Sequence, residues 1–485
     1  MNSSARQFAT EIVRTLRARG HQAYLVGGCV RDLLLGREPA DYDVATDAAP
    51  EQVMQIFPET YAVGAQFGVV LVPIPRKNGG QKSAVGGALE SNPHSSEGRV
   101  ADDPGGEEAA VPVPKHEVIE VSTFRCDVGY SDGRHPDHVR YSKSAQEDVQ
   151  RRDFSINGML FDPIANEVLD FVGGRQDLEA GIIRTIGAPE ERFREDKLRM
   201  LRAVRFAARF DYRIEDATLA AIQRLAHEIH QVSRERMRDE LLKMLTEGRA
   251  RRAFELMEQA GLLAEILPEI ARMKGVEQPP QFHPEGDVWT HTLLMLEQLP
   301  AGASRTLAMG VLLHDVGKPP TFRRAPDRIR FDGHVEVGVK MAEEICRRFR
   351  FPNDDTEQIA ALVANHMRFA DVQRMRQATL KRFLRLPRFE EHLALHRADC
   401  LSSHRDLSLY EFTRQKLAQL PPEAIRPTPL LTGNDLIAAG YAPGPRFKEI
   451  LSAVEDLQLE GKLHNHEEAV GWVRQQFPIE SAGNA

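Results

Sequence analysis

Two aspartates close to a double glycine carry the clearest chemistry in this sequence. Asp41 and Asp43 stand shortly after the segment 27–32, which reads Gly-Gly-Cys-Val-Arg-Asp. Residues at i and i+2 of a β-strand point to the same side, so both carboxylates would face one place. Such ligands suit Mg²⁺, which shares substrate phosphates with a few protein carboxylates. The glycines, Gly28 among them, let the backbone approach a phosphate. The pattern therefore favours phosphoryl or nucleotidyl transfer.

A third carboxylate often completes such a site, in which one metal ion lowers the pKa of the attacking hydroxyl and another steadies the leaving pyrophosphate. We expect Glu120 to supply this carboxylate, because it lies on an apolar segment predicted to be a strand. Glu117 is a competing candidate. A charge on an edge strand is the alternative interpretation.

A basic segment offers contacts for a polyanion. Residues 192–213 include eight basic and three acidic residues, a local charge of +5 in a chain of net charge −8. Asp196 and Arg199 would share one face of a helix. One interpretation is an exposed ion pair. The other is recognition of a nucleobase, in which Asp accepts a hydrogen bond from an exocyclic amino group and Arg donates one to a ring acceptor. Cytosine and adenine offer that pattern, whereas uracil and guanine do not.

Further side chains could contact the phosphates and the ribose of a nucleotide. They come from the glycine segment, from the basic segment and from residues 151–157, which read Arg-Arg-Asp-Phe-Ser-Ile-Asn. Besides Gly28, Asp196 and Arg199, the nucleotide-binding candidates are Arg31, Arg152, Asp153, Asn157, Arg202 and Arg205.

The elements that must position these residues alternate between strands and helices. Strands are predicted at 23–26, 42–45, 67–73 and 118–125, and helices at 31–35 and 50–57. Residues 76–116 contain seven Gly, four Pro, four Ser and no aromatic residue, which predicts a disordered insertion between two strands. From about Leu178 onward the apolar residues follow helical spacing. The expected fold is a small α/β head followed by a long, mostly α-helical body.

The composition is that of a soluble globular protein, with 42% hydrophobic and 28% charged residues. A chain of 485 residues is too long for one core and predicts two to four domains. The first 20 residues are predicted to form an amphipathic helix rather than a secretory signal. The sequence contains no apolar run long enough to predict a membrane-spanning helix. The four cysteines form no Cys-x-x-Cys motif, which fits reduced thiols in the cytoplasm.

A second set of chemically capable residues lies between positions 283 and 404. An adjacent His-Asp pair follows an apolar helical run, with further histidines and an aspartate on either side. Such residues ligate one or two metal ions when the fold brings them together. The metal candidates, with His283 nearby, are His291, His314, Asp315, His334, His366 and Asp399.

The motifs of the first half resemble, in order, those of the class II tRNA nucleotidyltransferase and bacterial poly(A) polymerase family. They are GGCVRD with DYD, RRDFSINGM, DFVGGRQDL and EDKLRMLRAVRF. The resemblance implies a polymerase-β-like head on a helical neck, with Asp41 and Asp43 as ligands of Mg²⁺. It also implies that Arg152, Asp153 and Asn157 lie near the ribose and the triphosphate.

The same resemblance implies that Asp196 and Arg199 select CTP and ATP without a nucleic-acid template. The loop at 130–136 resembles a flexible loop of the family members that add the terminal A, which disfavours a CC-only enzyme. It leaves open whether the enzyme adds the whole CCA or the A alone.

The second set resembles the HD phosphohydrolase superfamily, whose pattern His…His-Asp…Asp is matched by His291, His314, Asp315 and Asp399. The resemblance implies hydrolysis of phosphomonoesters or of 2′,3′-cyclic phosphates by a divalent metal of unknown identity. His334 and His366 would permit a second metal ion. The alternative is a degenerate helical domain that only holds tRNA.

The expected organisation is a nucleotidyltransferase head at 1–172, a helical neck and body at 173–275, an HD domain at 276–410 and a helical, tRNA-binding tail at 411–485. The expected function is addition of the 3′-terminal CCA to tRNA from CTP and ATP in the cytoplasm, together with an HD phosphohydrolase activity. The alternatives are an A-adding tRNA nucleotidyltransferase, a poly(A) polymerase acting on RNA 3′ ends, and a chain whose main activity is that of its HD half.

Overall fold

The computed structural model describes residues 4–61, 68–75, 118–128, 138–281 and 283–479. The predicted insertion at 76–116, the competing candidate Glu117 and the loop at 130–136 lie outside the described residues. The chain forms two compact units. Unit 1 comprises Met1–Glu240 and Leu256–Ile266, and unit 2 comprises Leu241–Glu255 and Leu267–Ala485. Among the described residues, no helix has the length and apolar character that a membrane crossing requires.

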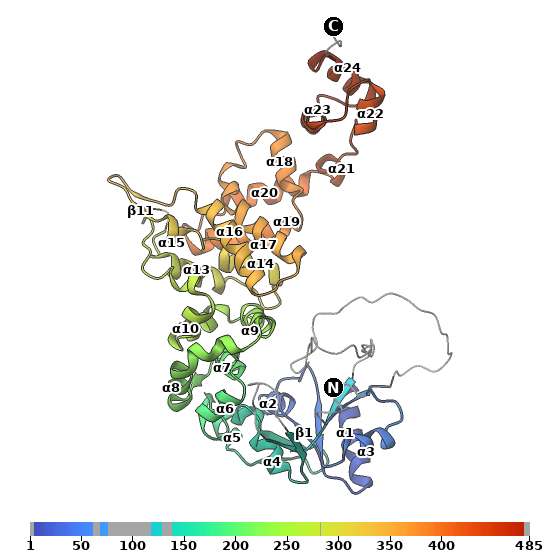
Figure 1. Ribbon diagram of the computed structural model, residues 1–485, viewed down its shortest axis with the longest axis vertical. Helices are drawn as coiled ribbons and strands as arrows, with labels where there is room; N and C mark the ends of the chain where they lie inside the picture. Colours follow the sequence, from blue (N-terminus) through green and yellow to red (C-terminus); the bar gives the residue numbers. More distant parts are fainter. Residues whose placement is uncertain (1–3, 62–67, 76–117, 129–137, 282, 480–485) are drawn as a thin grey trace. The chain divides into compact units, whose positions relative to one another are not determined.

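Unit 1 is built around a mixed six-stranded sheet (Figure 1). Its strands, in spatial order, are β3 (Val69–Pro73), β4 (Val118–Thr123), β2 (Asp43–Thr46), β1 (Ala23–Val26), β7 (Met159–Asp162) and β8 (Glu167–Asp170). β2 and β4 are parallel, and the other neighbours are antiparallel. The four predicted strands are confirmed with small changes at their ends. β7 and β8 were not predicted, because their apolar runs are very short.

Helices and short elements complete the described part of unit 1. The amphipathic helix predicted at the N-terminus is α1 (Ser4–Ala18), which packs on β1 through buried Ile12, Val13 and Leu16. The other elements are α2 (Gly28–Leu34), α3 (Pro50–Ile56), β5 (Arg125–Val128), β6 (His138–Tyr141), α4 (Ala145–Gln150), η2 (Ser155–Asn157), α5 (Gly174–Ala180), β9 (Ile182–Ile183), α6 (Pro189–Glu195), α7 (Leu198–Phe210), β10 (Arg213–Ile214), α8 (Asp216–Leu225), η3 (Ala226–Gln231) and α11 (Leu262–Ile266).

Two helices, α9 (Arg234–Thr246) and α10 (Ala250–Gln259), each contribute residues to both units. Unit 2 is helical apart from one small hairpin, as the periodicity predicts. Its elements are α12 (Pro268–Ala271), α13 (Val288–Glu297), α14 (Arg305–Leu313), α15 (Lys318–Thr321), β11 (Arg323–Arg324), β12 (Ile329–Arg330), α16 (His334–Arg348), α17 (Asn353–Asn365), η4 (His366–Asp371), α18 (Gln377–Leu384), α19 (Phe389–Ser402), α20 (Ser408–Gln419), α21 (Pro422–Ile425), α22 (Gly433–Ala438), α23 (Pro445–Leu459) and α24 (His466–Gln476).

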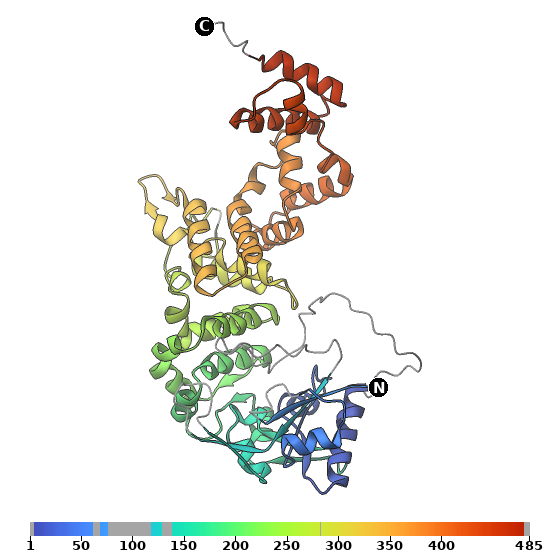
Figure 2. The same ribbon diagram turned by 45° about the vertical axis from the view of Figure 1, so that its right-hand side comes forward.

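Within unit 2, α14, α16, α17 and α19 pack against one another and form the bundle that carries most of the metal candidates (Figures 1 and 2). A neighbouring apolar cluster is centred on Phe369, Phe383 and Phe389. A separate cluster around Ile450 and Val454 holds α22, α23 and α24 together at the C-terminal end. The metal candidates therefore lie on helices whose positions are fixed by buried side chains.

Candidate functional site

The double glycine forms the turn between β1 and α2. Gly27 has a φ of +79°, which favours glycine. A Cβ at this position would lie 3.5 Å from Nη1 of Arg152 and 3.9 Å from Oδ2 of Asp43. Gly28 is the first residue of α2. The glycine turn thus lies beside Asp43 and Arg152 at one end of the central strands.

Only one of the two predicted metal aspartates lies on a strand. β2 begins at Asp43, which is half-buried, whereas Asp41 is exposed in the preceding loop. Glu120 is the partner of Asp43 in the parallel β2–β4 pair. Burial raises the pKa of Glu120; Arg152 and Arg125 oppose this shift, and the carboxylate of Asp41 adds to it. Glu120 thus lies beside Asp43 in the sheet and is affected by the charge of Asp41, although the three carboxylates are not among the groups of described residues whose ligand atoms all lie within 4.8 Å of one another. Because β4 lies between β3 and β2, the edge-strand interpretation of Glu120 is wrong.

A chain of polar contacts links α2 to α7 through the segment 151–157. Arg31 donates from Nη1 to Oδ1 of Asn157 at 2.6 Å, and Asn157 donates to Oδ1 of Asp153 at 3.2 Å. Arg202 donates from Nε to the other oxygen of Asp153 at 2.9 Å. Burial alone would raise the pKa of Asp153, but the guanidinium groups of Arg202 and Arg199 hold it below its ordinary value. Arg31 and Asn157 are buried and hold this network in place.

Two other predicted nucleotide-binding arginines differ in exposure. Arg152 pairs with Asp148 at 3.1 Å, and its buried Nε has no hydrogen-bond partner among the described residues. Arg205 is buried and pairs with Glu240 of α9 at 2.7 Å. The side chain of Arg152 is 20% exposed and can therefore face a bound anion beside Asp43, whereas Arg205 pairs with Glu240 inside the protein core.

The helix expected to carry Asp196 and Arg199 is interrupted. α6 ends at Glu195, Asp196 has an extended backbone, and α7 begins at Leu198. Oδ1 of Asp196 accepts from the backbone N–H of Leu198, and Oδ2 pairs with Arg236 at 2.8 Å. Arg199 pairs with Glu195 at 2.5 Å. The predicted helix through Asp196 and Arg199 is therefore wrong, because the backbone of Asp196 is extended. The alternative, an ion pair between the two residues, is also wrong, because each side chain pairs with another residue.

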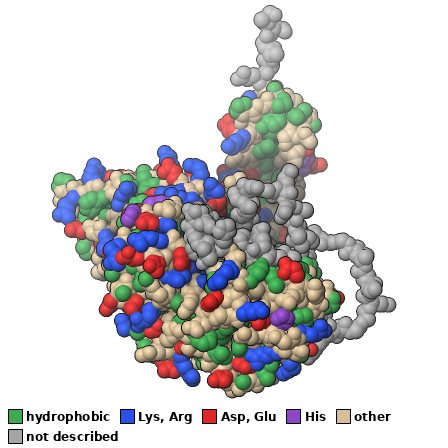
Figure 3. All heavy atoms as spheres, turned by 60° about the horizontal axis from the view of Figure 1, so that its bottom comes forward, with side chains coloured by type: hydrophobic (Ala, Val, Ile, Leu, Met, Phe, Trp, Pro, Cys, Tyr) green, Lys and Arg blue, Asp and Glu red, His purple; other side chains and the backbone are tan. Residues whose placement is uncertain are grey.

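The basic segment does not form the uncompensated patch that its sequence predicts. Most of its basic side chains pair with carboxylates, several of which come from outside the segment. On the face shown in Figure 3, basic and acidic side chains are likewise interspersed. The pairs are Arg192–Glu195, Arg194–Glu190, Lys197–Glu228, Arg199–Glu195, Arg202–Asp153 and Arg205–Glu240.

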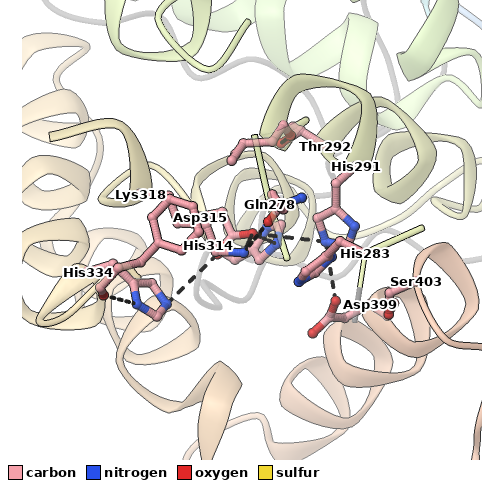
Figure 4. A network of polar contacts seen from close by, with 12 residues as sticks. Gln278, His283, His291, Thr292, His314, Asp315, Lys318, His334, Asp399 and Ser403 are labelled. Carbon is pink, nitrogen blue, oxygen red and sulfur yellow. Dashed lines mark hydrogen bonds and ion pairs between the residues drawn. The ribbon is translucent and has the colours of Figure 1, made fainter. Parts of the chain in front are cut away.

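The second set of candidates converges within unit 2 (Figure 4). Its residues come from α13, the end of α14, the start of α16, the end of α17 and α19. Three groups of described residues have ligand atoms within 4.8 Å of one another: His291 with His314 and Asp399, Asp315 with His334 and His366, and His283 with Glu285 and His291. All six predicted metal residues are therefore brought together.

Asp315 connects the first two groups. Its Oδ2 lies 3.1 Å from Nε2 of His314, and its Oδ1 lies 3.7 Å from Nε2 of His366. Lys318 contacts Oδ2 at 2.7 Å. Burial would raise the pKa of Asp315, but His314 and Lys318 hold it well below the ordinary range. Asp315 is thus an anion that can face two cations with different oxygens.

The histidines are oriented as metal ligands. Nδ1 of His314, His334 and His366 lies 2.7–3.0 Å from a backbone carbonyl oxygen three residues earlier. A carbonyl oxygen only accepts, so Nδ1 carries the proton and Nε2 keeps its lone pair. These three Nε2 atoms, and that of His291, are buried and have no hydrogen-bond partner of good geometry in the described part of the chain. This donor set fits a divalent metal centre.

A glycine allows the first two groups to approach each other. A Cβ on Gly317 would lie 2.0 Å from the carbonyl oxygen of His334 and 2.7 Å from the backbone nitrogen of Gly338. Any side chain at 317 would push α16 away from the turn that carries His314 and Asp315. Gly317 is therefore required for the spacing between Asp315 and His334.

Sequence reasoning missed two residues of this centre. Lys318 stands three residues after Asp315, and that spacing was the available signal. Glu285 contacts His283 and His291 at 2.8 and 2.7 Å, and its place between these histidines in the sequence gave only a weak signal.

Three family models match the chain. "Poly A polymerase head domain" matches residues 23–81 and 95–184, and "Probable RNA and SrmB- binding site of polymerase A" matches residues 211–274. "HD domain" matches residues 287–403. The fold and its sites thus define a nucleotidyltransferase with a polymerase-type head and an HD domain.

Relatives of the chain identify the family. The CCA-adding enzyme of Geobacillus stearothermophilus is 30% identical over 479 residues, which cover 97% of each chain. The crystal structure of the Bacillus stearothermophilus CCA-adding enzyme in complex with CTP matches with a TM-score of 0.68, 26% identity and 98% coverage of both chains. Poly(A) polymerase I of Salmonella typhi is 35% identical over 277 residues, 54% of this chain and 50% of that protein. The chain belongs to the family of CCA-adding enzymes.

Proposed function

We propose that this protein adds the 3′-terminal CCA to tRNA from CTP and ATP without a nucleic-acid template. The observation that carries the proposal is the pairing of Asp43 with Glu120 across β2 and β4, beside Arg152, in a chain of the CCA-adding family. A tRNA substrate also agrees with the cytoplasmic location expected from the sequence.

In the proposed reaction the 3′-hydroxyl of the tRNA attacks the α-phosphorus of the nucleotide, a P–O bond forms and pyrophosphate leaves. Mg²⁺, when bound, supplies positive charge for the attacking and leaving oxygens. Asp41, Asp43 and Glu120 would hold it, because clustered carboxylates are the protein ligands that Mg²⁺ prefers. Arg152 would donate to a triphosphate oxygen from beside Asp43. Asp153 would lie near the ribose and the triphosphate, in a position fixed by its contact with Arg202.

Asp196 and Arg199 would select the base. Polar atoms of both side chains already contact protein partners. A bound base would therefore replace the contacts to Arg236 and Glu195 with contacts to its own edge.

The experiment that tests the proposal incubates the protein with tRNA lacking its 3′-terminal CCA, together with CTP, ATP or both, and sequences the products. A CCA-adding enzyme yields CC with CTP alone and CCA with both nucleotides. An A-adding enzyme extends only tRNA that already ends in CC. Failure to add C to the shortened tRNA would contradict the proposal.

The match to Poly(A) polymerase I makes polymerisation of A on RNA 3′ ends the second candidate. The two functions differ in product length and in acceptor. A poly(A) polymerase extends a generic RNA by many A residues, whereas a CCA-adding enzyme stops after one A on tRNA. The same sequencing experiment with an unstructured RNA separates them.

We also propose that the HD domain hydrolyses phosphomonoesters or 2′,3′-cyclic phosphates, with water adding across the P–O bond. The buried, unpartnered Nε2 atoms beside Asp315 and Asp399 support this activity. The identity of the divalent metal is part of the test: the apoprotein is reloaded with Mg²⁺, Mn²⁺, Co²⁺ or Ni²⁺ before hydrolysis is measured.

Asp315→Asn tests whether the two activities are separate. It removes the charge that faces both histidine groups. We expect hydrolysis of a 2′,3′-cyclic nucleotide to be lost and CTP incorporation to stay at the wild-type rate. The matched control is Asp332→Asn, an exposed aspartate of the same unit. Hydrolysis that survives in Asp315→Asn would contradict the assignment of Asp315, whereas a wild-type protein that hydrolyses no phosphoester would favour a domain that only holds tRNA.

A further inference from the structure

Glu285 contacts two histidines with a single oxygen. Its Oε1 lies 2.7 Å from Nδ1 of His291 and 2.8 Å from Nδ1 of His283. The two rings meet edge to face with centroids 4.9 Å apart, next to the aspartates of the metal centre (Figure 4). Because an ionised carboxylate only accepts hydrogen bonds, both Nδ1 atoms carry protons.

This contact fixes the tautomer of His291. In the neutral ring, the proton on Nδ1 leaves the lone pair on Nε2, which lies 3.3 Å from Oδ1 of Asp399 and 4.0 Å from Oδ2 of Asp315. Nε2 of His291 is buried, and among the described residues it has no hydrogen-bond partner of good geometry. Glu285 therefore presents the metal-binding nitrogen of His291 to the first ligand group.

His291 differs from the other three metal histidines in how its ring is held. Nδ1 of His314, His334 and His366 donates to a backbone carbonyl of its own turn. Nδ1 of His291 instead depends on a side chain, which a substitution can remove while the helix stays intact.

The loop that carries Glu285 is anchored independently of this contact. Asp287 caps α13 by accepting from the backbone N–H of Thr290 at 2.8 Å, and its other oxygen accepts from the backbone N–H of Gly275 at 2.6 Å. The side chain of Glu285 is 8% exposed. Removing its carboxylate therefore leaves the loop in place and frees the ring of His291.

We propose that Glu285 is the positioning residue of the HD metal centre, acting through His291 on the metal group that includes His314 and Asp399. A carboxylate behind a ligating histidine fixes the ring and makes its other nitrogen a stronger ligand. The inference rests on the proposed metal-dependent function of the HD domain, and it adds a residue outside the His…His-Asp…Asp pattern.

The test is metal affinity rather than hydrolysis. Full-length apoprotein is titrated with Co²⁺, and binding is followed by the visible absorption of the bound ion. We expect Glu285→Ala to weaken one Co²⁺ site about 10- to 100-fold, the usual effect of losing such a contact. Glu285→Gln should lose less, because its amide oxygen can still accept from Nδ1 of His291. Glu277→Ala, an exposed glutamate of the same unit, is the matched control.

The outcomes are distinct. Equal Co²⁺ affinity in Glu285→Ala and Glu277→Ala overturns the inference. If Glu285→Ala unfolds, as its circular dichroism would show, Glu285→Gln decides: an affinity equal to that of the control overturns the inference. If Co²⁺ binding depends on Glu285 but the wild-type protein hydrolyses no phosphoester, the inference is supported and the hydrolase activity is refuted. A wild-type protein that binds no Co²⁺ and hydrolyses no phosphoester with Mg²⁺, Mn²⁺, Co²⁺ or Ni²⁺ refutes both.

Discussion

Glu120 lies directly opposite Asp43 across the parallel pair of β2 and β4. Registered partners in a parallel pair project their side chains to the same face of the sheet. The two carboxylates come from segments that the long insertion separates in sequence. Their alignment is therefore a property of the sheet, and it makes Glu120 the third acidic group of the proposed nucleotidyl-transfer site.

We expect Glu120→Gln to lower the rate of CTP incorporation by about 10²-fold or more, because it removes a carboxylate that would hold Mg²⁺, whose stabilisation of transition-state charge is worth several kcal/mol. The measurement is single-turnover incorporation into tRNA lacking its 3′ end. Glu167→Gln, on an exposed position of the same sheet, should leave the rate unchanged. Similar rates in the two variants would remove Glu120 from the site.

Asp196→Asn should relax the choice of nucleotide. The asparagine oxygen can still accept from the backbone N–H of Leu198, so the break between α6 and α7 is kept. A site built to hydrogen-bond its substrate discriminates by up to about 10⁴- to 10⁵-fold, so loss of the acceptor should remove part of that factor. The measurement compares kcat/KM for CTP with that for UTP, and Glu190→Gln is the exposed control. Unchanged exclusion of UTP and GTP, also in a variant that combines Asp196→Ala with Arg199→Ala, would show that the pair does not read the base.

Glu240→Ala should destabilise unit 1 strongly. It leaves the guanidinium group of Arg205 buried without its 2.7 Å partner. Breaking a buried pair in this way costs about 3–5 kcal/mol of the free energy of unfolding. Arg224→Ala, which breaks an exposed pair with Glu190 in the same unit, should cost about 0–1 kcal/mol. Urea unfolding gives both values, and equal values would contradict a structural role for Arg205.

Unit 2 should lose stability in mild acid through two buried histidines of α19. Burial lowers the pKa of His392 and that of His396 to about 4, below the unfolded value of about 6.5. Between these values the unfolded chain binds more protons, so the free energy of unfolding falls as the pH falls, by about 1.4 kcal/mol per pH unit for each histidine.

The measurement is the melting temperature of the full chain as a function of pH. His392→Gln combined with His396→Gln should flatten the fall between about pH 6.5 and pH 4. The exposed His464→Gln should leave the profile unchanged. An unflattened profile in the double variant would show that neither histidine is neutral in the folded protein.

Local patterns predicted much of the fold and of both sites. Short apolar runs between turns predicted four of the central strands, and the His-Asp pair with its distant partners predicted the six residues that converge in unit 2. The strands need only a local pattern, whereas the distant histidines and aspartate were chosen by residue type and by their resemblance to the HD pattern.

The features that sequence reasoning missed depend on contacts between distant segments. The helix expected through Asp196 breaks where its carboxylate caps Leu198 and pairs with Arg236 of α9. The basic segment is neutralised largely by acids of other elements, such as Glu240. Glu285 acquires its role only when α13 places His291 beside the metal centre. No periodicity or local charge count contains these pairings.

The chain crosses between its two units three times, at residues 240, 255 and 266. Unit 1 is completed by Leu256–Ile266, which includes α11 and contacts η3; Glu265 lies 3.0 Å from His230 there. During synthesis, the ribosome must therefore make a piece of unit 2 before it makes the last piece of unit 1. A nascent chain that ends at Glu240 holds every strand of the central sheet but not the segment that closes the unit around η3. Completion of the first unit is thus tied to translation of the early part of the second.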